Sequence, residues 1–237
     1  MENRSNASKS GNVMMIRIEG VNKVFNEGTA QAFEALKSID LEVARGETII
    51  LSGVSGSGKS TLLSLIAALD KPSSGEIVVE GELISKLPDL LASAYRANSI
   101  GFIFQHFNLL ESLSVEENVI APLINSGLDI ETIKQMAAKS MQRAAISHKA
   151  SQQVIELSGG EKQRCAIARA LVHDPELIIC DEPTANLDRE NSLKFIEILQ
   201  SLHQRGKTII VAAHDPLFET LPYVNKIVHM EDGVIYE

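Results

Sequence analysis

Apolar residues along this chain form two patterns, short runs bounded by turn residues and longer segments with helical spacing. The short or alternating runs predict strands at residues 15–20, 39–43, 47–51, 76–81, 100–104, 177–180, 207–213, 226–230 and 234–236. Helical spacing predicts helices at residues 59–69, 89–97, 114–146, 158–172 and 189–204. Residues 21–33 are interpreted as a polar segment with one well-placed aromatic, Phe25. Together these elements predict an α/β fold.

Three details refine this prediction. The run at 177–180 is apolar at every position, as expected of a parallel strand whose sheet is covered on both faces. Ser114 followed by Glu117 predicts a capping box at a helix start. The last two strands are separated by a Glu-Asp-Gly turn, which suggests a hairpin. No internal repeat is visible, so we expect one module and not a tandem pair.

The segment from Gly53 to Thr61 stands between a predicted strand and a predicted helix, and it fits G-x-x-x-x-G-K-[ST], the phosphate-binding P-loop. Its glycines allow the backbone to wrap closely around a polyphosphate. The N–H groups from about Gly56 to Thr61 open the helix and attract anions. Lys59 can reach the β- and γ-phosphates of a nucleotide, and the Ser60 hydroxyl can bind Mg²⁺. A chance match in a glycine-rich turn is the alternative, and the flanking strand and helix argue against it.

Composition narrows the range of partners. The net charge of −9 over 237 residues argues against a nucleic-acid partner, which would favour a basic face. The two cysteines, Cys165 and Cys180, lie in apolar runs and are interpreted as buried, reduced thiols. No apolar run approaches the roughly 18–20 residues that span a bilayer, and no secretory signal is visible. We therefore expect that any transport role requires a membrane partner.

Two acidic residues follow the apolar strand at 177–180. Asp181 is placed to hold Mg²⁺, directly or through water. Glu182 is placed to polarise the water that attacks the γ-phosphate. A strand that ends in two acids is weak evidence alone, but after a P-loop it fits a Walker B strand.

A second glycine-containing helix start lies at residues 157–161, Leu-Ser-Gly-Gly-Glu. Its N–H groups form another anion-binding point, and because one ATP needs only one such site, the second is expected to serve the nucleotide of another copy. With Lys-Gln-Arg at 162–164 and Ala-Ile-Ala-Arg-Ala-Leu at 166–171, the stretch resembles the signature of the ATP-binding-cassette (ABC) ATPase family. Glu161 stands where the family usually has Gln. Glycines present for packing alone are the alternative.

The resemblance covers nearly all of residues 15–237 and implies further roles. Phe25 matches the A-loop aromatic that stacks on adenine, although the family more often has Tyr, and Phe33 is the less favoured stand-in. Gln105 matches the Q-loop glutamine, which contacts Mg²⁺ or water and senses the membrane partner. Asp188 ends the D-loop match at 185–188, which crosses the dimer seam. His214 matches the switch histidine that contacts the γ-phosphate, after an Ala where the family usually has Thr or Ser.

The predicted site assigns catalysis to Glu182, His214 and Lys59. Mg²⁺ is assigned to Ser60, Gln105 and Asp181. Contacts to ATP are assigned to Phe25, Gly53, Ser55, Gly56, Ser57, Gly58, Lys59, Ser60, Thr61, Gln105, Ser158, Gly159, Gly160, Glu161 and Asp188.

The same resemblance implies a P-loop NTPase (RecA-like) core with an N-terminal antiparallel β subdomain and an inserted α-helical subdomain at approximately residues 106–172. Residues 1–13 are polar and rich in Ser and Asn, so we expect a disordered N-terminal extension. Residues 14–237 are then the ATP-binding domain.

For function, the resemblance implies a homodimer that holds two ATP and drives an integral membrane permease from the cytoplasmic face of the membrane. Soluble members of the family usually carry two cassettes or a long coiled coil, and this chain has neither. Segments at 68–75, 101–110, 117–119 and 122–123 resemble the lipoprotein-releasing and macrolide-exporter branch. Two alternatives stay open: a cell-division type that signals without transporting, and a module that binds ATP without turnover.

Overall fold

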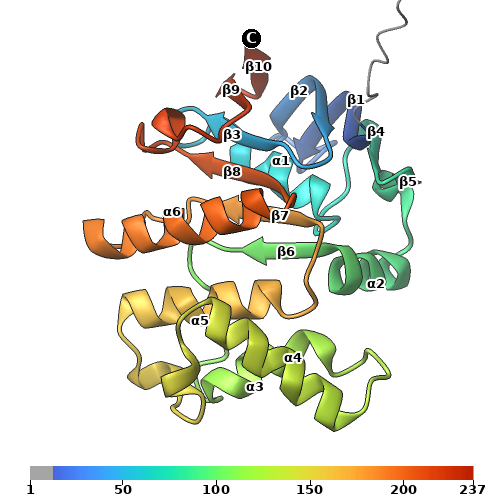
Figure 1. Ribbon diagram of the computed structural model, residues 1–237. Coiled ribbons are helices and arrows are strands. Elements are labelled where there is room, and N and C mark those ends of the chain that lie inside the picture. The colour runs from blue at the N-terminus through green and yellow to red at the C-terminus, as the bar shows by residue number, and fades with distance from the viewer. Residues whose placement is uncertain (1–12, 237) are drawn as a thin grey trace, which may run out of the picture.

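The computed structural model describes residues 13–236, and two β-sheets organise this part of the chain (Figure 1). The predicted extension at 1–13 therefore lies, except for Val13, outside the described residues. The smaller sheet is antiparallel, with strand order β2-β1-β4-β5. Its strands are β1 (Met14–Phe25), β2 (Phe33–Ala44), β4 (Ser74–Val79) and β5 (Glu82–Leu83).

The larger sheet has the order β10-β9-β3-β8-β7-β6. Its strands are β3 (Thr48–Ser52), β6 (Ile100–Ile103), β7 (Leu177–Asp181), β8 (Thr208–Ala213), β9 (Lys226–Glu231) and β10 (Val234–Tyr236). All neighbours are parallel except β9 and β10, which form the predicted hairpin at one edge. Every residue of β8 is buried, which explains its continuous apolar run, because both faces of the sheet are covered.

Helices cover both faces of the large sheet. They are α1 (Lys59–Ile66), α2 (Asp89–Ser99), α3 (Val115–Ile120), α4 (Ile130–Arg143), α5 (Gly159–Leu171) and α6 (Arg189–Gln204). Short 3₁₀ turns lie at Ile84–Lys86, Ala121–Leu123, Ser147–Lys149, Val154–Glu156 and Phe218–Thr220. No helix within residues 13–236 is long and apolar enough to cross a bilayer.

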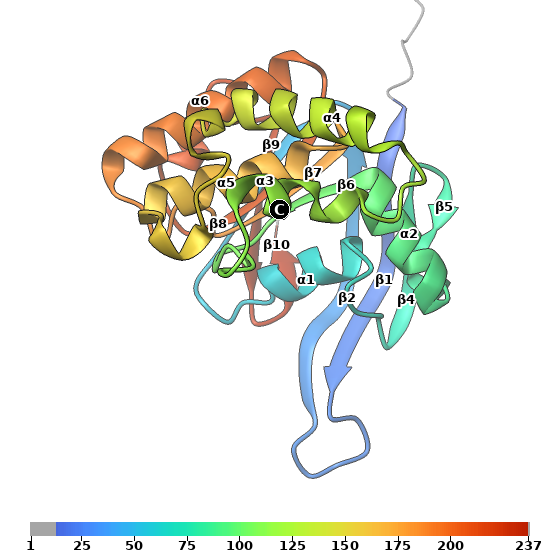
Figure 2. The same ribbon diagram turned by 90° about the horizontal axis from the view of Figure 1, so that it is seen from below.

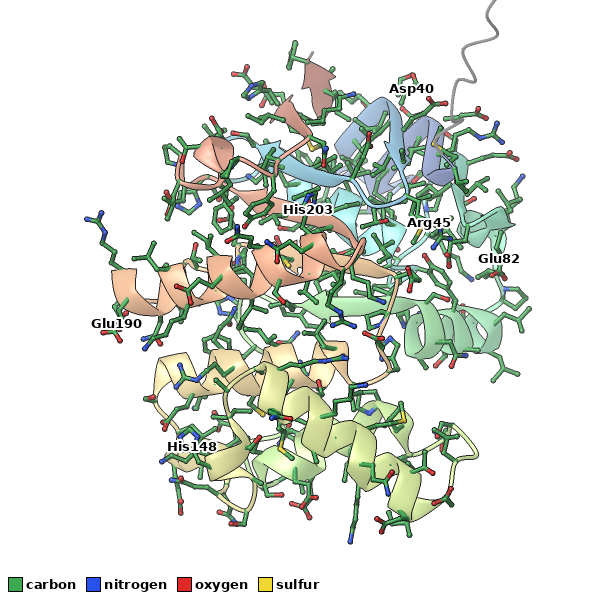
Figure 3. The ribbon with its side chains drawn as sticks, viewed as in Figure 1. Asp40, Arg45, Glu82, His148, Glu190 and His203 are labelled. Carbon is green, nitrogen blue, oxygen red and sulfur yellow. The ribbon has the colours of Figure 1, made fainter. Side chains whose placement is uncertain are left out.

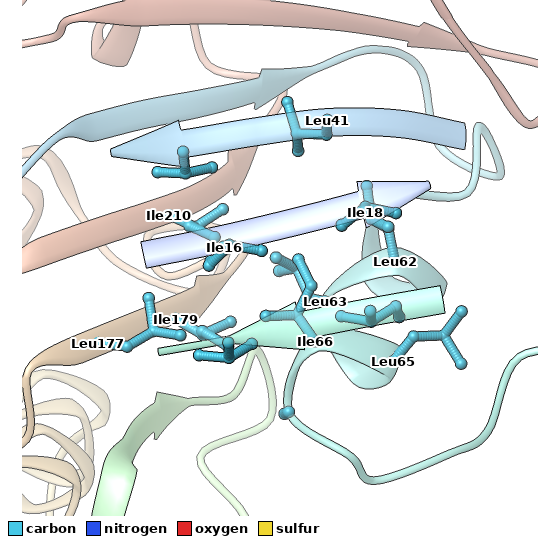
Figure 4. Packing of buried hydrophobic residues seen from close by; sticks show 14 of the residues in the cluster. Ile16, Ile18, Leu41, Leu62, Leu63, Leu65, Ile66, Leu177, Ile179 and Ile210 are labelled. Atoms are coloured by element: carbon cyan, nitrogen blue, oxygen red, sulfur yellow. The ribbon is translucent and has the colours of Figure 1, made fainter. Parts of the chain in front are cut away.

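Helix α1 lies between the two sheets and joins them into one core (Figure 4). Leu62 and Leu63 are fully buried in a cluster that includes Ile16 of β1 and Ile210 of β8. A second cluster on the opposite face of the large sheet gathers α3, α4, α5 and α6. The P-loop that precedes α1 is therefore fixed by the sheet behind it and by the packing of its own helix.

The three helices α3, α4 and α5 pack on one another (Figures 1 and 2). In the sequence they all lie between strands β6 and β7. Ser114 caps α3 with the predicted capping box to Glu117. The predicted helical stretch 114–146 is divided after Leu123, and Gly127 in the connection adopts a left-handed φ of 75°. The approximate boundaries 106–172 for a helical subdomain remain a prediction.

The interpretation of residues 21–33 as a polar segment is wrong in its first part, because β1 continues to Phe25. Lys23 occupies an inward position of this strand and is only 9% exposed. Its ammonium group donates to Asp70 at 2.7 Å and to the Lys71 carbonyl at 2.8 Å. A buried, ion-paired lysine interrupts the apolar alternation while the strand itself goes on.

Helix α1 is shorter than predicted and ends at Ile66. Ala68 has a left-handed φ of 49°, its N–H donates to Leu65, and the next N–H donates to Ser64. These two hydrogen bonds form a Schellman motif, in which glycine normally takes the left-handed position. Because alanine stands there, the sequence contains no residue that marks the end of the helix.

Candidate active site

The P-loop follows β3 and is confined by backbone from β2 and β9. Gly58 has a left-handed φ of 104°, and a Cβ at this position would lie 2.9 Å from the Ala35 carbonyl oxygen. A Cβ at Gly53 would collide with the carbonyl oxygen of Met230. The N–H of Gly233 donates to the Ser57 carbonyl at 3.1 Å. The β9–β10 hairpin therefore helps to hold the loop that precedes α1.

Lys59 is 5% exposed, and its ammonium group points into the curve of the loop. Its Nζ donates to the carbonyl oxygens of Gly53 at 2.7 Å and Val54 at 3.0 Å. The same Nζ lies 3.8 Å from Oε1 of Glu182. A buried cation is thus held by two backbone dipoles and one carboxylate, at the place where the motif predicts phosphates.

Ser60 and Asp181 come from separate elements, α1 and the end of β7, and meet through a hydrogen bond of 2.8 Å from the Ser60 hydroxyl to Oδ1 of Asp181. Burial raises the pKa of Asp181. The Ser60 hydrogen bond and the positive charge of Lys59 lower it, and the charge of Glu182 adds to the rise. Both oxygen atoms are of the kind that Mg²⁺ prefers.

Glu182 follows β7 with a left-handed φ of 44°, and its N–H donates to the Ala212 carbonyl at 2.9 Å. This backbone turn places the carboxylate beside His214, whose Nδ1 lies 2.7 Å from Oε2. When Glu182 is ionised, Nδ1 must carry the proton of this hydrogen bond. The Glu182 side chain is 14% exposed and that of His214 is 65% exposed, so the histidine faces the solvent side of the pair.

A cavity of about 350 Å³ brings most of the predicted residues together. It is lined by Phe25, Phe33, Ala35, Ser55, Gly56, Ser57, Gly58, Lys59, Ser60, Thr61, Gln105, Glu182 and His214. Phe25 and Phe33 are cross-strand partners at the β1–β2 end and both line the cavity, so geometry does not separate the favoured A-loop aromatic from its stand-in. These residues could hold adenine at one end and a triphosphate along the P-loop.

The residues predicted from the second glycine motif do not line this cavity, and neither do Asp188 of the D-loop match, Gly53 or Asp181. Ser158 caps α5, Gly159 and Gly160 begin that helix, and Asp188 caps α6. The hydroxyl and N–H of Ser158 both donate to Oε2 of Glu161, at 2.7 and 2.9 Å. The structure therefore divides the predicted nucleotide contacts between two separate surfaces.

Asn191 joins these two helix starts, and no motif in the sequence indicated it. Its N–H and its Nδ2 donate to the Asp188 carboxylate at 2.8 and 2.9 Å, and its Oδ1 accepts from Arg164 at 3.0 Å. A Cβ at Gly160 would lie 2.5–2.8 Å from the Asn191 amide atoms, whereas a Cβ at Gly159 would meet only the Asn186 carbonyl at 3.8 Å. Gly160 is thus required by packing inside the chain.

We expect Gly160→Ala to destabilise the protein by roughly 1–3 kcal/mol, because the methyl group must displace an amide that is held on both sides. In a chain of this size the melting temperature would fall by about 2–4 °C per kcal/mol. Gly159→Ala is the control and should leave the melting temperature unchanged or slightly raised, since alanine is the better helix former. Equal melting temperatures for the two variants, or a lower one for Gly159→Ala, would contradict this account of Asn191.

Two of the three predicted Mg²⁺ ligands contact each other, and the third lines the nucleotide cavity. Ser60 and Asp181 are hydrogen-bonded, and Gln105 lines the same cavity. Within residues 13–236 no cluster of three or more His, Cys, Asp or Glu side chains forms a metal cage. Mg²⁺ commonly takes one or two protein ligands and completes its shell with phosphates and water. The donor set therefore suits an ion that arrives with a nucleotide.

The P-loop lies between a parallel strand and a helix, and an acidic residue of a nearby strand contacts its serine. Together these features define a P-loop nucleoside triphosphatase. A model of the ABC transporter family matches residues 36–185, which is more than half of the chain. The chain belongs to the ABC transporter family and is an ABC ATPase, an enzyme that hydrolyses ATP. The expected fold, with its antiparallel and helical additions to a P-loop core, is confirmed.

Several relatives match over most of this chain. The uncharacterized ABC transporter ATP-binding protein YknY of Bacillus subtilis is 40% identical, with 93% of this chain and 95% of that protein covered. The lipoprotein-releasing system ATP-binding protein LolD of Pseudoalteromonas translucida is 38% identical, with 94% and 95% covered. The macrolide export ATP-binding/permease protein MacB of Chlorobaculum tepidum is also 38% identical, with 94% of this chain but 34% of that protein covered.

Among solved structures, the ATP-binding cassette MJ0796 has been described as a dimer in a post-hydrolysis state bound to ADP and Pi. It is 35% identical to this chain, with a TM-score of 0.86 and coverage of 94% of this chain and 97% of that one. CbiO1 from Clostridium perfringens, part of the ABC transporter complex cbiONQ, is 32% identical with a TM-score of 0.81, and 95% and 88% of the two chains are covered.

Proposed function

We propose that two copies of this chain pair head to tail around two ATP molecules and drive a membrane permease. Each ATP would lie between Lys59 and Ser60 of one copy and Ser158 and Gly160 of the other. The observation that carries this proposal is the division of the predicted contacts between a cavity and a separate helix tip. A second copy is the natural way to bring the helix tip to the phosphates.

Within the closed pair, the residues of the cavity take distinct roles. Lys59, which now donates to two P-loop carbonyls, would turn to the β- and γ-phosphates. Glu182 would accept a proton from the attacking water, and its hydrogen bond to His214 fixes the orientation of the carboxylate. Ser60, Asp181 and Gln105 would hold Mg²⁺, which neutralises charge on the phosphate oxygens. Loss of the γ-phosphate then removes contacts between the copies, so the pair opens.

The membrane complex that this ATPase drives is proposed to be of the lipoprotein-release or macrolide/peptide-export type. Support comes from LolD and MacB among the relatives, which align with 94% of this chain. In MacB the matching cassette is part of a longer ATP-binding/permease protein, whereas LolD matches nearly end to end. We therefore propose that this chain works with a permease from the cytoplasmic face of the membrane. Co-purification and identification of the membrane subunit would distinguish such a transport complex from a complex of the cell-division type.

Mixing two inactive variants tests the head-to-tail pair. Lys59→Ala lacks the P-loop cation, and Ser158→Arg blocks the helix tip with a bulky side chain. Each variant alone should release almost no phosphate from ATP. In an equal mixture half of the dimers are mixed, and each mixed dimer has one intact site out of two. If the P-loop and the helix tip at each ATP come from different copies, the mixture should therefore recover up to about a quarter of wild-type activity.

The control is a mixture of Lys59→Ala with the double variant Lys59→Ala/Ser158→Arg, which has no intact site in any pairing. This mixture should stay inactive. If mixed dimers form, as judged by native mass spectrometry with ATP, and the first mixture also stays inactive, the head-to-tail arrangement is wrong. Full activity of Ser158→Arg alone would be equally damaging, because the helix tip would then be dispensable. Phosphate release by wild type but not by Lys59→Ala alone separates an ATPase from a module that binds ATP without turnover.

A further inference from the structure

The tip of helix α5 is occupied by a side chain of its own chain. Ser158 donates its hydroxyl to Oε2 of Glu161 at 2.7 Å and its N–H to the same oxygen at 2.9 Å, and the Glu161 N–H donates back to the Ser158 hydroxyl at 3.4 Å. A serine hydroxyl has a single proton to donate. Ser158 therefore cannot bind a phosphate oxygen through that proton while it binds Glu161.

Lys149 holds Glu161 from the other side. Its Nζ lies 3.2 Å from Oε1, the oxygen that Ser158 does not use. Lys149 ends the 3₁₀ turn Ser147–Lys149, and Figure 3 marks its neighbour His148 among the helices below the large sheet. The two side chains are 29% and 17% exposed, so water screens this pair only in part. The hydrogen bonds from Ser158 and the charge of Lys149 lower the pKa of Glu161 to about 2, so the carboxylate is ionised at neutral pH.

We propose that Glu161 sets the ATP concentration at which two copies close, because it must release Ser158 before Ser158 can bind the γ-phosphate held by the partner. The inference rests on the proposed head-to-tail dimer. Glu161 is a positioning residue that opposes closure in two ways. It competes for the Ser158 proton through a charge-assisted hydrogen bond, and its negative charge lies beside the place that the γ-phosphate must enter. Lys149 offsets the second effect.

The chain contains a second capping box of the same composition. Ser114 donates its N–H and its hydroxyl to Oε2 of Glu117, both at 2.7 Å, and accepts from the Glu117 N–H at 3.2 Å. This box caps α3, and neither residue lines the cavity. Glu117→Gln therefore removes the same charge from the same kind of cap at a helix that has no proposed phosphate contact.

The experiment measures ATP-dependent dimerisation by light scattering in the Glu182→Gln background, where slow hydrolysis keeps ATP bound. Glu161→Gln keeps an acceptor for the cap but removes the charge, and it should lower the ATP concentration for half-maximal dimerisation by about 3- to 10-fold. Lys149→Gln leaves the cap in place and uncovers the charge of Glu161, so it should raise that concentration by about 2- to 5-fold. Glu117→Gln should leave it unchanged. The effect of Glu161→Gln should shrink with added salt, since exposed charge is screened.

The two charge variants distinguish this role from simple helix capping. A cap that only stabilises α5 predicts that both variants weaken dimerisation, so shifts in the same direction overturn the inference. A midpoint for Glu161→Gln that stays within twofold of its parent also overturns it. If Glu161→Gln does not fold, the salt dependence of Lys149→Gln decides: its raised midpoint should return toward that of the parent as salt screens the uncovered charge, whereas a rise that salt leaves unchanged indicates a weakened cap and overturns the inference. Failure of the Glu182→Gln parent to dimerise with ATP contradicts the proposed head-to-tail dimer itself. This outcome is therefore distinguishable from a failure of the role inferred for Glu161.

Discussion

Replacing Glu182 by glutamine should lower the rate of ATP hydrolysis by about 10²–10³-fold, because a general base contributes about 10²–10⁴ and glutamine cannot accept the proton. Glutamine keeps the size of the side chain and can still accept the hydrogen bond from His214, which is 2.7 Å long in the wild-type chain. ATP binding should therefore be retained. Because hydrolysis no longer opens the pair, the dimer should accumulate with ATP, and its mass can be followed by light scattering.

A suitable control for this variant is Glu176→Gln. Glu176 precedes β7 and Glu182 follows it, so the two carboxylates lie at opposite ends of one strand. Glu176 pairs with Lys207 at 2.8 Å and does not line the cavity. Its substitution should leave phosphate release within twofold of wild type. A Glu182→Gln protein that hydrolyses ATP at the wild-type rate would remove Glu182 from catalysis, and one that stays monomeric with ATP would argue against the proposed sandwich.

Replacing Lys59 by alanine should weaken ATP binding by about 100-fold or more, because hydrogen bonds from a charged donor contribute roughly 1.5–3 kcal/mol each and the motif predicts contacts to two phosphates. The nucleotide-free protein should also lose stability. The carbonyls of Gly53 and Val54 lose their donor, and Glu182 loses the cation 3.8 Å away. A fluorescent ATP analogue measures the first effect, and thermal unfolding measures the second.

Lys207→Ala separates the two effects. Lys207 is 5% exposed, as is Lys59, and its Nζ donates to the Asp174 carbonyl at 3.0 Å and to Glu176 at 2.8 Å. It stands at the far end of β8 from His214 and does not line the cavity. Both variants should unfold at lower temperature, and only Lys59→Ala should lose affinity for the nucleotide. Parallel loss of affinity in Lys207→Ala would mean that general destabilisation explains the result.

Local patterns were sufficient to predict most of the elements and one half of the site. The P-loop and the acidic end of β7 are each recognisable from a few neighbouring residues, and the family resemblance added the histidine after β8. The parallel sheet brings their side chains to one edge. The buried cysteines and the terminal hairpin were predicted in the same way, and the structure confirms both. The roles assigned to individual residues remain predictions.

The features that sequence reasoning missed depend on partners far apart in the chain. Lys23 continues β1 because Asp70 pairs with it, and no local pattern contains that partner. Asn191 supports the tip of α5 only because its own helix, α6, packs beside α5. Lys149 contacts Glu161 from the 3₁₀ turn Ser147–Lys149. Asn186 likewise donates to the Gln105 carbonyl at 3.0 Å, which joins the D-loop match to the Q-loop match. A motif records the residue that acts, whereas the residues that hold it can lie anywhere in the chain.

The contact between the P-loop and the β9–β10 hairpin has a consequence for synthesis. Gly53 packs against the Met230 carbonyl, and Ser57 accepts a hydrogen bond from Gly233. These partners leave the ribosome long after the P-loop itself has emerged. The nascent chain therefore lacks a finished nucleotide pocket until the β9–β10 hairpin has emerged, and ATP can favour the folded protein only after that hairpin has left the ribosome.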